Sequence, residues 1–272
     1  MLSAVAFVIG ACIGSFLNVC IHRIPADESV VHPRSRCPRC AKPIAWYDNL
    51  PIVSWLLLRA RCRHCGEPIA SRYPIVEAAT GGLAVLALAC FGPTLHAAVA
   101  FAFSAALLLI TYIDFDHRFI PDEVSLPGVL VGLGASFVDE GGPTPLASFL
   151  GVVLGGGLLW AVAWAYERAT GVEGMGLGDV KLLAMIGAVL GWQAIPVVLV
   201  IASVTGSLAG LLVMAFGRTR RTAGRVHRRF GARALPVYAR RAARRTAIPF
   251  GPFLALGAAL ALYLPDAARL WG

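Results

Sequence analysis

Charged residues are scarce in this chain of 272 residues. Asp, Glu, Lys and Arg make up 14% of it, whereas a typical soluble domain carries about 25%. Hydrophobic residues make up 58% of the chain, and its mean hydropathy is +0.73. This composition excludes a disordered chain and argues against a soluble globular enzyme.

The scarcity is concentrated in long segments with no charge or, in one case, a single charge. One membrane crossing by a helix takes about 20 residues. Turn-forming residues at 92–93 and 191–196 each divide one long segment into two. The segments are 2–21, 74–113, 124–138, 146–166, 182–217 and 248–265. The sequence therefore predicts an all-α polytopic membrane protein with eight transmembrane helices.

The first apolar segment lacks a basic flank before it and a convincing small-residue cleavage site after it. A secretory signal peptide needs both features, so we expect residues 1–21 to stay as the first transmembrane helix. Residues 22–73 are expected to form a small cytoplasmic domain. Residues 74–272 are expected to form a seven-helix membrane core with an arginine-rich cytoplasmic loop at 218–247.

Basic residues are nearly absent from one set of predicted loops. Of the 24 Lys and Arg residues, 23 fall in the loops 22–73, 114–123, 167–181 and 218–247. Because basic loops remain in the cytoplasm, these loops should face inward and both termini outward. The arginines of the last loop come without an interleaved aromatic platform or a nucleic-acid-binding motif. We therefore expect that loop to contact anionic membrane lipid, with no nucleic-acid partner.

The predicted cytoplasmic domain holds two CxxC motifs, formed by Cys37 with Cys40 and by Cys62 with Cys65. Two such knuckles supply the four thiolates of a tetrahedral zinc site. Four sulfur ligands leave no open position for water, so the site is predicted to be structural. A redox pair is the alternative, and disulfides are disfavoured in a reducing compartment.

Two aspartates occupy matching positions at the predicted cytoplasmic face. Asp114 directly follows one apolar run, and Asp179 directly precedes another, after glycines at 174, 176 and 178. The helices that follow both motifs are short, which favours a hydrated cavity between them. Two carboxylates across such a cavity can share one proton and activate a water molecule. The alternative is that Asp114 ends one helix and Asp179 caps another.

The other acidic residues of these regions have simpler interpretations. Asp116 is expected in a solvated loop, and Asp122 after Pro121 at the start of a helix. Glu77 lies inside an apolar span, where a charge is costly. It is either a structural anchor, for example through pairing with Arg72, or a neighbour of the active site.

The order of several motifs resembles the type IV prepilin peptidases of bacteria. They are Gly14-Ser-Phe-Leu-Asn-Val, His22-Arg-Ile-Pro, the paired CxxC knuckles, Trp46-Tyr-Asp-Asn-Leu-Pro, Arg72-Tyr-Pro-Ile-Val-Glu77, Ile113-Asp114-Phe-Asp-His through Pro121-Asp122, Gly176-Leu-Gly-Asp179-Val-Lys181 and Phe250-Gly-Pro-Phe. The matches run in order from about residue 10 to about residue 260, so the resemblance covers nearly the whole chain.

This resemblance implies an aspartic endopeptidase of the bacterial inner membrane. Its substrates would be type IV prepilins and type II secretion pseudopilins, cut after a glycine on the cytoplasmic side. Asp114 and Asp179 would be the catalytic pair, and the four cysteines would bind zinc. The resemblance also implies methylation of the new N-terminus with S-adenosylmethionine, although the sequence holds no methyl-donor fingerprint of its own.

Two alternatives come from other classes of protein. A presenilin-type intramembrane protease shares the GxGD motif, but the cysteine motifs and the placement of both aspartates at one face argue against it. A transporter or assembly scaffold could use acidic residues along an ion path. A transporter often shows an internal repeat, and inspection of the sequence finds none.

Overall fold

The computed structural model describes residues 1–171, 176–216 and 249–264. The secondary structure of this part is helical, apart from two isolated β-bridges. Its elements are α1 (Leu2–Arg23), η1 (Ile24–Ala26), η2 (Trp46–Asn49), α2 (Val53–Leu57), α3 (Arg72–Phe91), α4 (Leu95–His117), α5 (Asp122–Ala135), α6 (Pro145–Thr170), α7 (Leu177–Leu190), α8 (Ala194–Phe216) and α11 (Gly251–Tyr263). The predicted arginine-rich loop at 218–247, Gly174 and Arg269 lie outside the described residues.

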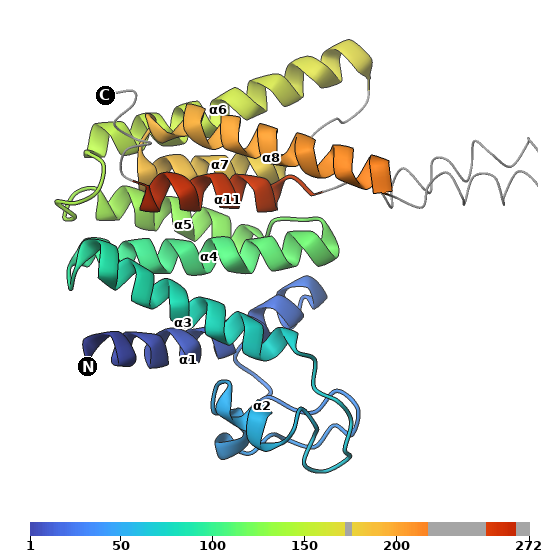
Figure 1. The fold of residues 1–272 in the computed structure, drawn as a ribbon. Coiled ribbons are helices and arrows are strands. Elements are labelled where there is room, and N and C mark those ends of the chain that lie inside the picture. The colour runs from blue at the N-terminus through green and yellow to red at the C-terminus, as the bar shows by residue number, and fades with distance from the viewer. Residues whose placement is uncertain (172–175, 217–248, 265–272) are drawn as a thin grey trace, which may run out of the picture.

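The longer helices run back and forth beside one another (Figure 1). The predicted break at 92–93 is confirmed: α3 ends at Phe91, and the Thr94 side chain accepts a hydrogen bond from the N–H of Ala97 to cap α4. The cysteine loop, which we define as residues 24–71, leaves the bundle at the C-terminal end of α1. It returns to the bundle at the N-terminal end of α3.

Five described helical segments are long and apolar enough to cross a membrane, judged by length and composition. They are Leu2–Ala26, Arg72–Phe91, Leu95–His117, Pro145–Thr170 and Ala194–Val213. The remaining helices at predicted spans, α5, α7 and α11, have 14, 14 and 13 residues. A helix of 14 residues is about 21 Å long, which is shorter than a hydrocarbon core of about 30 Å. All-helical membrane architecture is therefore present, and the count of eight crossings stays a prediction.

Glycines allow α1 and α3 to pack with their backbones in close approach. A Cβ atom on Gly10 would lie 2.8 Å from the Cβ of Ala84, and one on Gly14 would lie 2.8 Å from the Cα of Glu77. Helices in lipid gain little from hydrophobic burial against one another, so close packing of small residues holds them together. This spacing of glycines positions Glu77 directly against α1.

Helix α4 lies between two clusters of buried side chains. One cluster joins it to α1 and α3 through residues such as Leu17, Val76 and Leu109. The other joins it to α7, α8 and α11 through residues such as Leu107 and Leu183. Because both its sides are packed, the last turns of α4 have a fixed position relative to the starts of α7 and α11.

Candidate active site and metal centre

Asp114 lies near the C-terminal end of α4 and is buried, with 6% of its surface exposed. Its Oδ2 atom accepts a hydrogen bond from the backbone N–H of Gly251, at 3.1 Å, in the first turn of α11. A Cβ atom on Gly251 would lie 2.5 Å from that oxygen. Residue 251 therefore has to be a glycine for the backbone to approach the carboxylate this closely.

Asp179 lies in the first turn of α7, is half-buried, and lies within electrostatic range of Asp114. The glycine before it has a packing role, because a Cβ atom on Gly178 would lie 3.0 Å from the Cβ of Ile120. Ile120 also borders Gly251. The structure thus brings the two predicted aspartates, which are far apart in the sequence, to the same end of the bundle.

Two acidic neighbours of this pair form ion pairs. Asp116 lies on α4 and accepts a hydrogen bond from Arg72, the first residue of α3. The prediction of a loop position for Asp116 was therefore wrong, because α4 continues for one turn past the apolar run. Asp122 begins α5, as predicted, and both its oxygens lie 2.7 Å from the Nζ atom of Lys181 on α7.

The four predicted metal ligands meet in the cysteine loop. The Sγ atoms of Cys37, Cys40, Cys62 and Cys65 all lie within 4.8 Å of one another, and those of Cys37 and Cys65 are 3.8 Å apart. Tetrahedral zinc at about 2.3 Å from each sulfur separates neighbouring sulfurs by about 3.8 Å. The donor set and its geometry therefore fit a zinc ion with four thiolate ligands, which would hold the loop together.

The two knuckles are built alike. In the first, the N–H of Cys37 donates to the carbonyl of Lys42, and Arg36 and Pro43 form a β-bridge. In the second, the N–H of Cys62 donates to the carbonyl of Glu67, and a β-bridge joins Arg61 to Pro68. The residue after the second cysteine of each knuckle has a positive φ, 57° at Ala41 and 71° at Gly66.

Arg63, inside the second knuckle, ties the cluster to η2. Its Nε and Nη2 atoms donate to the two carboxylate oxygens of Asp48, at 2.8 and 2.6 Å. The guanidinium group lowers the pKa of Asp48 below its usual value. Such a two-bond pair fixes orientation as well as distance, so the pair sets the position of η2 relative to the knuckle.

Glu77 connects the cysteine loop to the membrane helices. It has 7% of its surface exposed, and its Oε2 atom accepts a hydrogen bond of 2.7 Å from the N–H of Ile52. The proposed pairing with Arg72 was wrong, since Arg72 binds Asp116 and stacks over the ring of Tyr112. Glu77 is thus an anchor of the loop, and its partner is a main-chain group that no side-chain pattern reveals.

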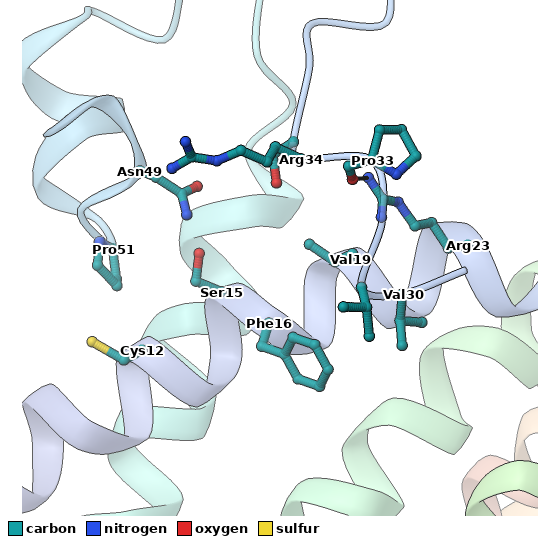
Figure 2. A pocket seen from close by; sticks show the side chains of 12 residues that line it. Cys12, Ser15, Phe16, Val19, Arg23, Val30, Pro33, Arg34, Asn49 and Pro51 are labelled. Carbon is teal, nitrogen blue, oxygen red and sulfur yellow. Dashed lines mark hydrogen bonds between the residues drawn. The ribbon is translucent and has the colours of Figure 1, made fainter. Parts of the chain in front are cut away.

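Two adjoining hollows lie where the cysteine loop meets α1 and α3. The first is a cavity of about 740 Å³ whose walls include Trp55, Tyr73 and Glu77. The second is a groove of about 370 Å³ along α1, lined by Cys12, Ser15, Phe16 and Val19 together with residues of the loop (Figure 2). Ser15, Val19 and Asn49 are among the residues that border both hollows.

Comparison with known proteins decides the family. Residues 8–91 match the bacterial peptidase A24 N-terminal domain, and residues 101–211 match the type IV leader peptidase family. A protein of Burkholderia pseudomallei named prepilin leader peptidase/N-methyltransferase is 38% identical, over 96% of this chain and 84% of its own length. The chain belongs to the type IV leader peptidase family.

Other members of this family are similarly close. An Aeromonas hydrophila protein with the same name is 35% identical over 98% of this chain and 92% of its own length. A Myxococcus xanthus protein, again with that name, is 42% identical over 76% of this chain and 62% of its own length. No solved structure matches the chain.

The residues of the candidate metal centre and those of the candidate active site fall in different family matches. The N-terminal match covers the four cysteines and Glu77, and the leader peptidase match covers Asp114 and Asp179. Gly251 lies beyond both matches, and reasoning from residue patterns missed its contact with Asp114. The only signal in the sequence was the motif Phe250-Gly-Pro-Phe.

Proposed function

We propose that this chain is a membrane aspartic endopeptidase that removes the leader of type IV prepilins or pseudopilins. Cleavage follows a glycine on the cytoplasmic side, and the enzyme then methylates the new N-terminus. Membership of the leader peptidase family supports this assignment. The observation that carries it is the placement of two partly or fully buried aspartates, Asp114 and Asp179, at one end of the bundle.

Such a pair can activate water without a metal ion at the scissile bond. Two like charges in a partly buried site do not both ionise cheaply, so one carboxyl group is ionised while the other is protonated. The ionised group removes a proton from water as the water attacks the scissile carbonyl, and the protonated group polarises that carbonyl. The N–H of Gly251 fixes Oδ2 of Asp114, which leaves Oδ1 to share the proton.

The other parts of the chain have supporting roles in this proposal. Cys37, Cys40, Cys62 and Cys65 hold a structural zinc ion, and methyl transfer uses S-adenosylmethionine. The enzyme lies in the bacterial inner membrane with eight crossings and both termini outside the cytoplasm. The arginine-rich segment 218–247 contacts anionic lipid. The family matches do not favour the presenilin-type protease or the transporter.

The test is co-expression with a candidate prepilin, followed by mass spectrometry of the pilin N-terminus. This reports cleavage and methylation together. Asp114→Asn and Asp179→Asn keep the side-chain shape but remove proton exchange, so each should abolish cleavage while the protein still inserts. Asp116→Asn and Asp122→Asn are the matched controls, because both residues are exposed at the same end of the bundle, and they should cost far less. Full cleavage by well-expressed Asp179→Asn would refute the proposed pair.

A further inference from the structure

Glu77 has a buried carboxyl group that the proposed peptidase chemistry does not use. Its hydrogen-bond donors are the N–H of Ile52 and the hydroxyl of Ser15, and neither has a positive charge. Among the described residues, no ion pair joins Glu77 to a basic side chain. A carboxylate without a cation is expensive to keep in an apolar span, so a positively charged ligand would complement it.

The cavity beside Glu77 has the size and lining of a small-molecule site. Its volume of about 740 Å³ falls within the range of about 300–1,000 Å³ common for such sites. Trp55 and Tyr73 contribute aromatic rings, which suit both a stacked heterocycle and a cation. The indole of Trp55 is held in place, because its Nε1 atom donates to the carbonyl of Ile69 at 3.1 Å. Asn49 adds a polar amide to the wall.

We propose that this cavity binds S-adenosylmethionine, with the sulfonium group beside Glu77. The donor joins an aromatic heterocycle to a permanent positive charge, which matches the aromatic rings and the buried carboxylate. This inference rests on the methyl transfer of the proposed function, and it assigns that activity a place separate from Asp114 and Asp179. The donor supplies a methyl group: the amine nitrogen bonds to the methyl carbon as the carbon–sulfur bond breaks, sulfur keeps the electron pair, and the methylated ammonium releases one proton to water.

The methyl acceptor can reach this cavity from the neighbouring groove. The groove follows the exposed face of α1 (Figure 2). It shares Ser15 and Asn49 with the cavity. Phe16 and Val19 give it an apolar side, which suits an apolar pilin N-terminus. Arg72 links the two activities in space, since it adjoins Tyr73 of the cavity and binds Asp116, two residues from Asp114.

The experiment measures binding to the purified full-length, zinc-loaded protein by isothermal titration calorimetry. The probes are S-adenosylmethionine, which is a sulfonium cation, and S-adenosylhomocysteine, whose sulfur is neutral. Glu77→Gln should weaken binding of the cation by about tenfold or more, because a charge-assisted contact is lost. Binding of the neutral product should change by less than about threefold. The Gln side chain still accepts from Ile52, so the zinc content should be unchanged.

Matched controls separate this site from the peptidase. Glu140→Gln makes the same change at an exposed carboxylate that does not line the cavity, and both affinities should stay as in the wild type. Asp114→Asn should bind both probes normally although it cleaves nothing, and Glu77→Gln should still cleave prepilin. Equal weakening of both probes by Glu77→Gln, or no weakening, would overturn the proposal. So would loss of donor binding in Asp114→Asn.

A second measurement uses the wild-type protein, so its outcome does not depend on whether a variant folds. The wild-type protein is irradiated with S-adenosylmethionine carrying a photoreactive azide on the adenine, and labelled peptides are sequenced. Label should fall on cavity-lining peptides, foremost those holding Trp55 or Tyr73. Label confined to peptides that do not line the cavity would place the donor elsewhere and overturn the proposal.

Discussion

The backbone N–H of Gly251 donates a hydrogen bond to the carboxylate of Asp114, a residue 137 positions earlier in the chain. This contact makes α11 part of the wall around the proposed catalytic pair. Since no side chain intervenes, the position of the carboxylate depends directly on the backbone of α11. Substitutions at residue 251 should therefore affect chemistry more than insertion into the membrane.

Gly251→Ala should lower the rate of prepilin cleavage by about a hundredfold, because a displacement of about 1 Å at a catalytic group has effects of that size. The added Cβ would lie 2.5 Å from Oδ2 of Asp114, so the carboxylate or the helix must move. Cleavage is followed by mass spectrometry of the pilin. Gly82→Ala is the control, because no heavy atom lies within 4 Å of its added Cβ, and it should cleave normally.

Gly187→Ala should destabilise the protein. A Cβ atom there would lie 2.1 Å from the carbonyl oxygen of Gly151, so α6 and α7 would have to separate. Overpacking of this kind costs about 1–3 kcal/mol, which lowers the unfolding temperature by about 5 °C. Thermal unfolding in detergent measures the effect. Gly157→Ala, with open space around its Cβ, should leave the temperature unchanged, and equal losses in both variants would contradict the packing argument.

Ala41→Gly and Gly66→Ala should shift zinc affinity in opposite directions. Both residues have a positive φ, which costs an alanine about 1 kcal/mol or more and a glycine nothing. Because metal binding and folding of such a loop are coupled, affinity should rise about fivefold in the first variant and fall about fivefold in the second. Competition with a chelator measures both affinities. A shift in the same direction for the two variants would contradict the shared knuckle geometry.

Removal of the metal should release the cysteine loop. We expect about one zinc ion per chain by elemental analysis, since the four thiolates complete one tetrahedron. Chelation or Cys62→Ser should expose residues 37–65 to proteolysis. Cys90→Ser serves as the comparison, because Cys90 is exposed on α3 and outside the cluster. Metal-free protein with a protease-resistant loop would show that zinc has no structural role.

The side on which Glu140 lies decides whether the short helix α5 crosses the membrane. If it does, Glu140→Cys and Glu28→Cys should react with a membrane-impermeant thiol reagent from opposite sides. Both positions are exposed, and the labelling is carried out in a background lacking Cys12, Cys20 and Cys90. Reaction of both from the cytoplasmic side would leave α5 outside the set of crossings and reject the eight-span topology.

Features that depend on local pattern were predictable from the sequence. Uncharged runs located the helices, and the spacing of Cys37, Cys40, Cys62 and Cys65 predicted that they would meet. The depth of Asp114 and Asp179 in their helices placed both at one face. The number of crossings does not follow from these runs, however, because composition alone does not decide whether a helix of 14 residues such as α7 spans the bilayer.

Contacts made by main-chain groups were beyond the reach of sequence patterns. The N–H of Gly251 and the N–H of Ile52 bind the two most buried carboxylates of the site region, Asp114 and Glu77. Every residue except proline has such a donor, so nothing in the residue type identifies the partner. Charge complementarity predicted that Arg72 would pair with Glu77. In the structure, Arg72 binds Asp116 instead, because of the register of α3 against α4.

The hydrogen bond between Ile52 and Glu77 restricts how the cysteine loop can be deleted from a protein of this fold. Arg23 and Arg72 end and begin helices packed side by side, so a chain that joined them by a short turn could keep the α1–α3 contact. The excised loop would, however, take with it the N–H that Glu77 requires. A shortened homologue should therefore carry an uncharged residue at this helix position, and loop and carboxylate should be gained or lost as one unit.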